Sequence, residues 1–316
     1  MRRTFALCCA TFLCAVITTA TIARGASPDD AKRLAKAAAV TFDYDNRKQV
    51  VANSLSLKSP EGLSLEKITL KPDGEAHIPL LLTLPSKRNG PVPLVVLLHG
   101  LGGNKRQLVD LYARRLAEKG IATAAFDLDG HGERKTAEND FRQKLGRGNL
   151  LAVGLSISRN VVDGRRVIDY AATRDELDSV KTAVMGYSLG SCIGCMLANA
   201  EPRVIGLVMN AGGTSRQLLA SINRNSAAAA FARMYRPMVH APGISPRPVL
   251  MINGSRDRVF PPADARLLFA ALDKPKEIRW YNTGHRLSAR AADDGALWLE
   301  KLLLADKAVE RSRPSQ

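Results

Sequence analysis

The segment Gly186–Gly190 has the sequence Gly-Tyr-Ser-Leu-Gly and places a serine between two glycines. An apolar, β-prone run precedes it, and small apolar residues typical of a helix follow it as far as Pro202. A serine on a sharp turn between a strand and a helix is a nucleophile for acyl transfer, and the glycines admit the close backbone approach of that turn. The helix N-terminus favours negative charge beside the serine. We therefore expect Ser188 to be a nucleophile whose hydroxyl faces solvent.

A nucleophilic serine needs a base, and the base needs an acid that orients it. His285 follows a strand-like run at 277–281, and Asp257 follows a buried-strand run at 248–253. The carboxyl ends of parallel strands meet at one edge of a sheet, so both side chains are expected near Ser188. The chain order serine, aspartate, histidine differs from that of the trypsin-like and subtilisin-like proteases.

A glycine-rich loop meets the third requirement, donors for the negative oxygen that forms during acyl transfer. The run 93–98 is typical of a central strand and leads into His99–Gly103, which has the sequence His-Gly-Leu-Gly-Gly. Glycines allow the backbone of such a loop to turn its amides inward. The loop therefore predicts an oxyanion site beside the serine.

Five motifs occur in a fixed order: His99–Gly103, Asp127–Gly132, Gly186–Gly190, Gly254–Asp257 and Gly284–His285. In this order they resemble the motifs of the alpha/beta-hydrolase superfamily. Their layout is closest to the dienelactone hydrolase and prolyl-oligopeptidase-like esterase branch. The resemblance covers roughly residues 78–304.

The resemblance implies a role for each matching residue. Ser188 would be the nucleophile, His285 the general base and then acid, and Asp257 the carboxylate that fixes the His285 tautomer. The oxyanion donors would be the backbone amides of Leu101 and Leu189. This chemistry requires no cofactor and no metal, and neither is predicted.

Several residues near these motifs have a structural interpretation. Ser191 stands where many relatives have a further glycine, and we expect its small side chain to be tolerated, although it could shift the packing of the helix on the sheet. Asp264 and Asp273 are alternative acids, but both lie in a helix-like stretch and are expected on a solvated face. His99 and His131 lie beside glycines and are expected to hold loops. His77 and His240 carry no motif and are expected on the surface or in loops.

The segment 214–247 is too long for a simple connection between two strands and is expected to form a cap. Its run Ala227–Ala232 favours a helix, and the apolar side chains that follow could roof the serine and limit substrate size. The predicted substrate-binding residues are Tyr187, Met234 and Met238.

A second insertion, at 133–150, is basic and interrupted by glycines. Its basic side chains could line a rim of the pocket and meet an anionic acyl group, but a solvated loop is the favoured interpretation. These side chains are Arg134, Arg142, Lys144 and Arg147.

The first 25 residues have the pattern of a secretory signal peptide. The basic start Met1–Arg3 precedes an uncharged run at 5–23, and Ala23 and Gly25 are small residues suited to cleavage after Gly25. An uncleaved membrane anchor is the second interpretation, because the run is nearly long enough for a bilayer of ~30 Å. Threonines within the run favour the signal peptide. We therefore expect export to the periplasm or the extracellular space.

The charge balance bears on partners. The chain has 46 Lys and Arg against 30 Asp and Glu, a net charge of +16, and loss of the three arginines within residues 1–25 leaves +13. Such a charge favours peripheral attraction to anionic surfaces. Nucleic-acid binding is not predicted, because no nucleic-acid motif, aromatic-interleaved basic stripe or phosphate loop is present.

Cys192 and Cys195 are the two cysteines outside the predicted signal peptide. Their C-x-x-C spacing lacks the further ligands that a zinc site needs, and the serine turn already occupies the helix start that a redox pair would use. We expect two small core residues. A disulfide between them is the alternative in an oxidising compartment.

The order of apolar patterns predicts an α/β fold. From residue 93 onward, strand-like and helix-like runs alternate, which favours a mostly parallel sheet with helices on both faces. Alternating runs at 63–70 and 77–84 flank a turn signal at 71–74 and predict antiparallel N-terminal edge strands. The predicted organisation is a signal peptide 1–25, an N-terminal polar helix or tether 26–46, one alpha/beta-hydrolase catalytic domain 47–310 with its cap at 214–247, and a disordered tail 311–316.

Together these features predict an exported serine hydrolase that cleaves a small-molecule or polymer-linked carboxylic ester. A peptidase or an acyltransferase of the same fold is the alternative, because the triad serves all three reactions and the sequence does not define the acyl acceptor. The esterase is favoured, since neither a propeller-sized N-terminal domain nor an acidic pair for gripping a substrate amine is evident. A catalytically silent binding protein is the least favoured interpretation, because the constellation is complete. The oligomeric state is not predicted.

Overall fold

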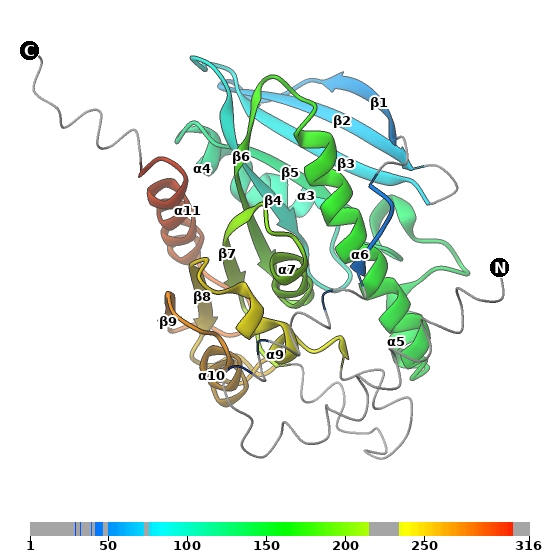
Figure 1. Ribbon diagram of the computed structural model, residues 1–316, viewed down its shortest axis with the longest axis vertical. Coiled ribbons are helices and arrows are strands. Elements are labelled where there is room, and N and C mark those ends of the chain that lie inside the picture. Colours follow the sequence, from blue (N-terminus) through cyan, green and yellow to red (C-terminus); the bar gives the residue numbers. More distant parts are fainter. Residues whose placement is uncertain are drawn as a thin grey trace, which may run out of the picture.

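A computed structural model of the chain describes residues 42–46, 50–72, 76–214 and 234–305, together with Asp29, Lys32 and Ala39 (Figure 1). The predicted signal peptide, most of the tether, part of the 71–74 turn, residues 215–233 of the cap and the C-terminal tail lie outside the described residues. No helix in the described ranges is both long and apolar enough to cross a bilayer.

A nine-stranded sheet forms the centre of the molecule, in the order β1-β2-β3-β5-β4-β6-β7-β8-β9 (Figure 1). The pairs β1–β2, β2–β3 and β3–β5 are antiparallel, and all other neighbours are parallel. The prediction of a mostly parallel sheet with antiparallel N-terminal edge strands is confirmed. The strands are β1 Val50–Leu57, β2 Leu63–Pro72, β3 Ile78–Pro85, β4 Val92–Leu98, β5 Ala122–Phe126, β6 Leu177–Tyr187, β7 Val204–Asn210, β8 Val249–Gly254 and β9 Lys276–Tyr281.

Helices cover both faces of the sheet, as predicted (Figure 1). Helices α6, α7 and α10 pack on one face, and the run from α3 to α4 packs with α11 on the other. Residues 105–117 form a continuous helical run with a π-helical segment, η2, in its middle. The helical elements are α3 Lys105–Leu108, η2 Val109–Ala113, α4 Arg114–Ala117, η3 Gly132–Arg134, α5 Phe141–Gly146, α6 Leu150–Ala171, α7 Leu189–Ala200, α9 Pro237–His240, η5 Ala241–Ile244, α10 Pro262–Ala271 and α11 Ala289–Leu303.

Strand β4 shows why the sheet is a rigid support. All seven of its residues are buried, and successive side chains point to opposite faces, so Val96 joins the core on one side and Val95 and Leu97 join the core on the other. Burial of each such side chain stabilises the fold by about 1.5–3 kcal/mol. The loops that leave the carboxyl ends of β4, β6, β8 and β9 therefore start from fixed points at one edge.

Two predictions about buried residues have opposite outcomes. Cys192 and Cys195 are buried on α7 with free thiols, so the core interpretation is confirmed and the disulfide is not formed. Burial raises the pKa of the Cys195 thiol. His240 is expected on the surface or in a loop but is fully buried at the end of α9, with its ring nitrogens 2.7 Å from the Met234 carbonyl oxygen and 3.0 Å from Asn199 Nδ2. Burial lowers the pKa of His240 to about 4.

Candidate active site

The turn between β6 and α7 holds Ser188 in a left-handed backbone conformation, with φ 55° and ψ −113°. A Cβ on Gly186 would lie 2.2 Å from the Gly190 carbonyl oxygen, and a Cβ on Gly190 would lie 1.9 Å from the Leu98 carbonyl oxygen. No other residue fits at either position. The prediction that both glycines serve close backbone approach is confirmed.

Ser191, the departure from the family pattern, is accommodated by hydrogen bonds. Its Oγ lies 2.9 Å from the Gly186 carbonyl oxygen and 2.7 Å from that of Asn210, and the residue is fully buried. The amide of Ser188 also donates to the Asn210 carbonyl oxygen, at 2.8 Å. The hydroxyl therefore ties α7 to the turn and to the end of β7.

Three side chains from separate loops meet at this turn. His285 Nε2 lies 2.9 Å from Ser188 Oγ, and His285 Nδ1 lies 2.8 Å from Asp257 Oδ2. The other carboxylate oxygen of Asp257 accepts the amides of Val259 and Phe260, at 2.8 and 3.0 Å. Because Nδ1 faces a carboxylate it carries the proton, and Nε2 is left to accept the serine proton. The structure thus brings the three predicted residues into one chain of hydrogen bonds.

The expectation of a solvent-facing serine is wrong. The exposed fraction of Ser188 is only 8%. The imidazole of His285 lies against the hydroxyl, and the glycine-rich loop lies on the other side, where a Cβ on Gly100 would be 3.3 Å from Ser188 Cβ. The sequence shows which turn the serine occupies but not how far neighbouring loops cover it.

The two predicted oxyanion donors belong to different elements: Leu189 directly follows the serine, and Leu101 follows Gly100, whose added Cβ would lie 3.3 Å from Ser188 Cβ. Leu189 is the first residue of α7, so its amide has no acceptor within the helix. Leu101 lies at the tip of the glycine-rich loop and is 40% exposed. Among the described residues, neither amide donates a hydrogen bond to the protein. Both N–H groups are thus available to a bound oxygen.

Buried polar side chains hold the glycine-rich loop in place through hydrogen bonds. His99 donates from Nδ1 to the Gly100 carbonyl oxygen at 2.8 Å and accepts the Leu128 amide at Nε2, at 3.1 Å. Burial lowers the pKa of His99 to about 4, so the ring stays neutral. Asp127 accepts both the amide and the Nζ of Lys105, at 2.8 and 2.6 Å. The structural interpretation of His99 is confirmed.

Tyr187 holds the His285 loop. Its hydroxyl donates to the His285 carbonyl oxygen at 2.8 Å and accepts the Leu287 amide at 3.0 Å. The two rings meet edge to face with centroids 6.1 Å apart. Burial raises the pKa of Tyr187, which keeps the hydroxyl protonated and able to donate. A substrate contact by Tyr187 stays a prediction.

The predicted roof residues pack in the core beside α7. Met234 is 5% exposed. Met238 is half-buried and packs against the hydrophobic core on the face of the sheet that α7 covers. Met238 lies in helix α9, which packs on α7, and there the Pro237 carbonyl oxygen accepts from Cys195 Sγ. Residues 215–233, which would complete the cap, lie outside the described residues. A substrate-binding role for either methionine stays a prediction.

Asp264 does not lie on a solvated face, so that expectation is wrong. Its exposed fraction is 8%, and its carboxylate accepts the amide of Thr214 at 2.9 Å and also the Thr214 hydroxyl. Helix α10 begins at Pro262, so Asp264 lies in its first turn and bonds to Thr214 in the loop after β7. Asp273, by contrast, is partly exposed and pairs with Lys32 at 3.5 Å, as expected for a surface position.

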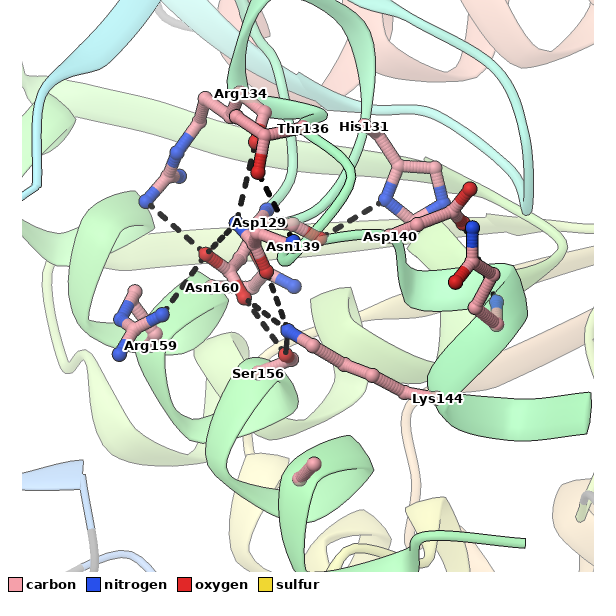
Figure 2. Close-up of polar contacts among 12 residues, drawn as sticks. Asp129, His131, Arg134, Thr136, Asn139, Asp140, Lys144, Ser156, Arg159 and Asn160 are labelled. Atoms are coloured by element: carbon pink, nitrogen blue, oxygen red, sulfur yellow. Dashed lines mark hydrogen bonds and ion pairs between the residues drawn. The ribbon is translucent and has the colours of Figure 1, made fainter. Parts of the chain in front are cut away.

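A second buried carboxylate, Asp129, is the centre of a network of polar contacts (Figure 2). Burial raises the pKa of Asp129, but the hydrogen bonds from Ser156 and Arg159 and the surrounding cations outweigh burial and hold it well below its usual range. The contacts to the Asp129 carboxylate are Ser156 Oγ at 2.6 Å, Arg159 Nη1 at 2.9 Å, Asn139 Nδ2 at 3.1 Å, Lys144 Nζ at 3.3 Å and Arg134 Nη2 at 3.8 Å.

This network decides the role of several residues in the basic insertion. Arg134 and Lys144 point into it and are not free to meet a substrate (Figure 2). His131 is 3% exposed and bonds through Nδ1 to the Asp129 carbonyl oxygen at 3.0 Å, which confirms a structural role. In the described ranges, no group of three or more His, Cys, Asp or Glu side chains is arranged to hold a metal ion.

Residues 95–309 match the model of the alpha/beta hydrolase family. The chain belongs to the alpha/beta hydrolase family. Among curated proteins, this hydrolase is similar to YtaP of Bacillus subtilis (strain 168), which is named as a presumed hydrolase. The two are 23% identical over 238 residues, 69% of this chain and 78% of YtaP. The superfamily resemblance is thus confirmed, and the dienelactone hydrolase branch stays a prediction.

Two solved alpha/beta hydrolases share the fold. The acetyl xylan esterase from Paenibacillus sp. R4 superposes with a TM-score of 0.66 at 19% identity, over 87% of this chain and 93% of the esterase. Acetyl xylan esterase 1 from Thermoanaerobacterium sp. JW/SL YS485 superposes with a TM-score of 0.69 at 18% identity, over 87% and 94%. At these identities the likeness shows a common fold.

Proposed function

We propose that the protein is a serine hydrolase that cleaves carboxylic esters through an acyl-enzyme on Ser188. The observation that carries the proposal is the chain of hydrogen bonds from Ser188 through His285 to Asp257. The unpartnered amides of Leu101 and Leu189 beside the serine add support. Two solved structures of the same fold are named as acetyl xylan esterases, which favours an ester over an amide.

In the first half-reaction, Ser188 Oγ attacks the ester carbonyl carbon while its proton moves to His285 Nε2. Asp257 stabilises the imidazolium that results. The negative oxygen of the tetrahedral intermediate accepts hydrogen bonds from the amides of Leu101 and Leu189. When the intermediate collapses, the bond to the alcohol oxygen breaks, and that oxygen takes the proton from His285. The products of this step are the free alcohol and the acyl-enzyme.

The second half-reaction repeats these roles with water. His285 Nε2 removes a proton from water, whose oxygen attacks the acyl carbon. The same two amides hold the oxyanion, and His285 returns the proton to Ser188 Oγ as the acid leaves. Asp257, which is 3% exposed and bound by two backbone amides, holds the His285 ring in one orientation through both halves.

A fluorophosphonate probe and a series of 4-nitrophenyl esters of increasing acyl length test the proposal. We expect labelling at Ser188, burst kinetics from the acyl-enzyme, and turnover of short-acyl esters. An aminoacyl anilide assayed in parallel tests peptidase activity, and added alcohol acceptors test acyl transfer. Absence of labelling together with absence of ester turnover would overturn the proposal.

Replacement of the nucleophile gives the sharpest single result. Ser188→Ala should lower ester turnover by about 10⁴-fold or more, because no other group at the turn can form the acyl-enzyme. The fold should survive, since the partner lost is the imidazole of His285, which keeps 28% side-chain exposure. Turnover measured with the same ester series, and circular dichroism as the control for folding, check both expectations. Parent-like activity in this variant would contradict the assignment.

We also propose that the protein is exported. The support is the sequence pattern of residues 1–25, with basic residues, an uncharged run and small residues in succession. Mass spectrometry of the protein purified from its native cells tests it. A mature N-terminus at Ala26 is the expected result, and an intact Met1 in a membrane fraction would support the anchor instead.

A further inference from the structure

Arg142 places a positive charge against the glycine-rich loop. It is an exposed residue of α5, and its Nη2 donates to the Leu101 carbonyl oxygen at 3.4 Å. Its guanidinium lies so close to the loop that a Cβ on Gly102 would be 2.0 Å from Nη2. The N and O atoms of one residue are at most about 4 Å apart, so the guanidinium lies within roughly 8 Å of the Leu101 amide. The charge therefore stands beside the proposed oxyanion site.

Two further arginines adjoin the other members of the candidate site. Arg286 follows His285 and Arg258 follows Asp257, and both are exposed. Burial raises the pKa of the Tyr187 hydroxyl, as does the charge of Asp257, and Arg286 acts to lower it. The positive charge of Arg286 thus acts on the Tyr187 hydroxyl, which contacts the His285 backbone.

Arg142, Arg258 and Arg286 have no carboxylate partner among the described residues, unlike several basic side chains of the insertion. Arg134 pairs with Asp163 at 2.6 Å, and Lys135 pairs with Asp140 at 2.9 Å. Lys144 and Arg159 bind the Asp129 carboxylate (Figure 2). Several basic side chains of the insertion are therefore neutralised, whereas Arg142, which contacts the Leu101 carbonyl oxygen, is not.

The carboxylates near the serine are also fully engaged. Asp257 accepts two backbone amides and the His285 ring, and Asp264 is bound by Thr214. Neither can neutralise an arginine of the rim. Arg142, Arg258 and Arg286 thus stay uncompensated among the described residues, with Arg142 at the glycine-rich loop and the other two adjacent in sequence to Asp257 and His285.

We propose that the natural substrate is an anionic ester, with a carboxylate within a few bonds of the scissile carbonyl, and that Arg142 is its main binding partner. This rests on the proposed function and adds the substrate class to it. The planar guanidinium suits a carboxylate, which it can bind through two parallel hydrogen bonds. A site rim of one sign also raises the local concentration of an oppositely charged substrate.

A matched pair of esters tests the proposal. Monomethyl succinate carries a carboxylate where methyl succinamate carries a neutral amide of nearly the same size, and acid release measures both. We expect kcat/KM to be about 10-fold or more higher for the anionic ester at low salt. The ratio should fall towards one in ~1 M salt, where screening acts over about 3 Å. Equal kcat/KM for the two esters, or a ratio that salt does not change, would overturn the proposal.

Arginine variants localise the preference. Arg142→Gln should lower kcat/KM for monomethyl succinate several-fold more than for methyl succinamate, and Arg142→Lys should retain part of the preference. Arg286→Gln should give a smaller change of the same sign. Arg106→Gln is the matched control, because Arg106 is exposed, lies on α3 and pairs with Asp110 at 2.8 Å; both esters should be unaffected. An equal loss for both esters in Arg142→Gln would mean that Arg142 only supports the loop.

The experiments distinguish failure of the proposed anionic substrate class from failure of the proposed serine esterase function. Fluorophosphonate labelling and turnover of methyl succinamate at a rate equal to that of the anionic ester would leave the serine esterase standing and overturn the anionic substrate class. Loss of labelling, with neither ester hydrolysed, would overturn the proposed function itself. The salt series uses the parent protein alone, so a variant that fails to fold does not remove the test.

Discussion

Asp129 and Asp257 occupy equivalent positions in the fold, but their carboxylates have different partners and suit different roles. Each lies three residues after the end of a sheet strand, β5 and β8, and their exposed fractions are 1% and 3%. Asp129 is surrounded by permanent cations, Lys144, Arg159 and Arg134, whereas within the described ranges the side chain bound to Asp257 is the His285 imidazole. A carboxylate saturated by permanent cations fixes a loop. A carboxylate whose partner gains and loses a proton can take part in proton transfer.

The largest difference between these two carboxylates should appear in turnover. Asp257→Asn should lower kcat/KM for the neutral 4-nitrophenyl esters by about 10⁴-fold, because an amide stabilises the wrong His285 tautomer and no imidazolium. Its effect on folding should be small, since an amide oxygen can still accept the Val259 and Phe260 amides. The control is Asp273→Asn on the partly exposed pair with Lys32, which should keep parent activity. A loss below tenfold for Asp257→Asn would end the distinction between the two sites.

Asp129→Asn should reverse the pattern and act on stability. Removing one partner of a buried ionic network costs about 3 kcal/mol, which urea unfolding measures. Asp110→Asn, in the exposed pair with Arg106, is the control and should change the unfolding free energy by less than about 1 kcal/mol. The lowered pKa of Asp129 gives the pH dependence. The advantage of the parent over Asp129→Asn should be complete above about pH 4 and shrink as the pH falls below that value, where the unfolded carboxyl takes up its proton.

Asp264→Asn tests a third carboxylate, which touches neither His285 nor a cation. It binds the amide and the hydroxyl of Thr214, so the amide variant should lose about 1–2 kcal/mol of unfolding free energy. Turnover of neutral esters should fall only modestly, through the loop after β7. A loss of activity as large as that of Asp257→Asn would mean that Asp264 shares the role of orienting His285.

The smallest expected effect concerns Tyr187, which acts through His285 and not on the substrate. Tyr187→Phe removes the hydroxyl that bridges the His285 carbonyl oxygen and the Leu287 amide. We expect kcat to fall about tenfold with KM nearly unchanged, because a base that is less well positioned affects the chemical step more than binding. A rise in KM that depends on acyl length, with kcat unchanged, would instead support the substrate contact predicted from the sequence.

The sequence could predict the parts of this site that depend on local backbone. The glycines on either side of Ser188 are required by contacts of 2.2 and 1.9 Å that any side chain would make, so the turn is encoded within five residues. The strands that lead to Asp257 and His285 are apolar runs, and parallel pairing brings their ends to one edge. The fold and the meeting of these residues therefore follow from short segments.

The sequence could not show what depends on partners distant in the chain. The bond of Asp264 to Thr214 spans 50 positions, and His240 is buried by Phe42, whose ring centroid is 5.4 Å away although the residues are almost 200 positions apart. Nor could the sequence show that Arg134 forms an ion pair with Asp163 whereas Arg142, in the same insertion, has no carboxylate partner among the described residues. Their side chains differ only in whether a carboxylate from another element reaches them.

Three of the five histidines of this protein are buried, which bears on its response to pH. Burial lowers the pKa of His99 and of His240 to about 4, and it also lowers that of His131. All three rings are closed off from solvent, whereas His285 stands at the serine. In a titration by NMR between about pH 5 and 8, the imidazole signals of His99 and His240 should stay fixed and serve as markers. The molecule thus supplies its own internal reference for such a titration.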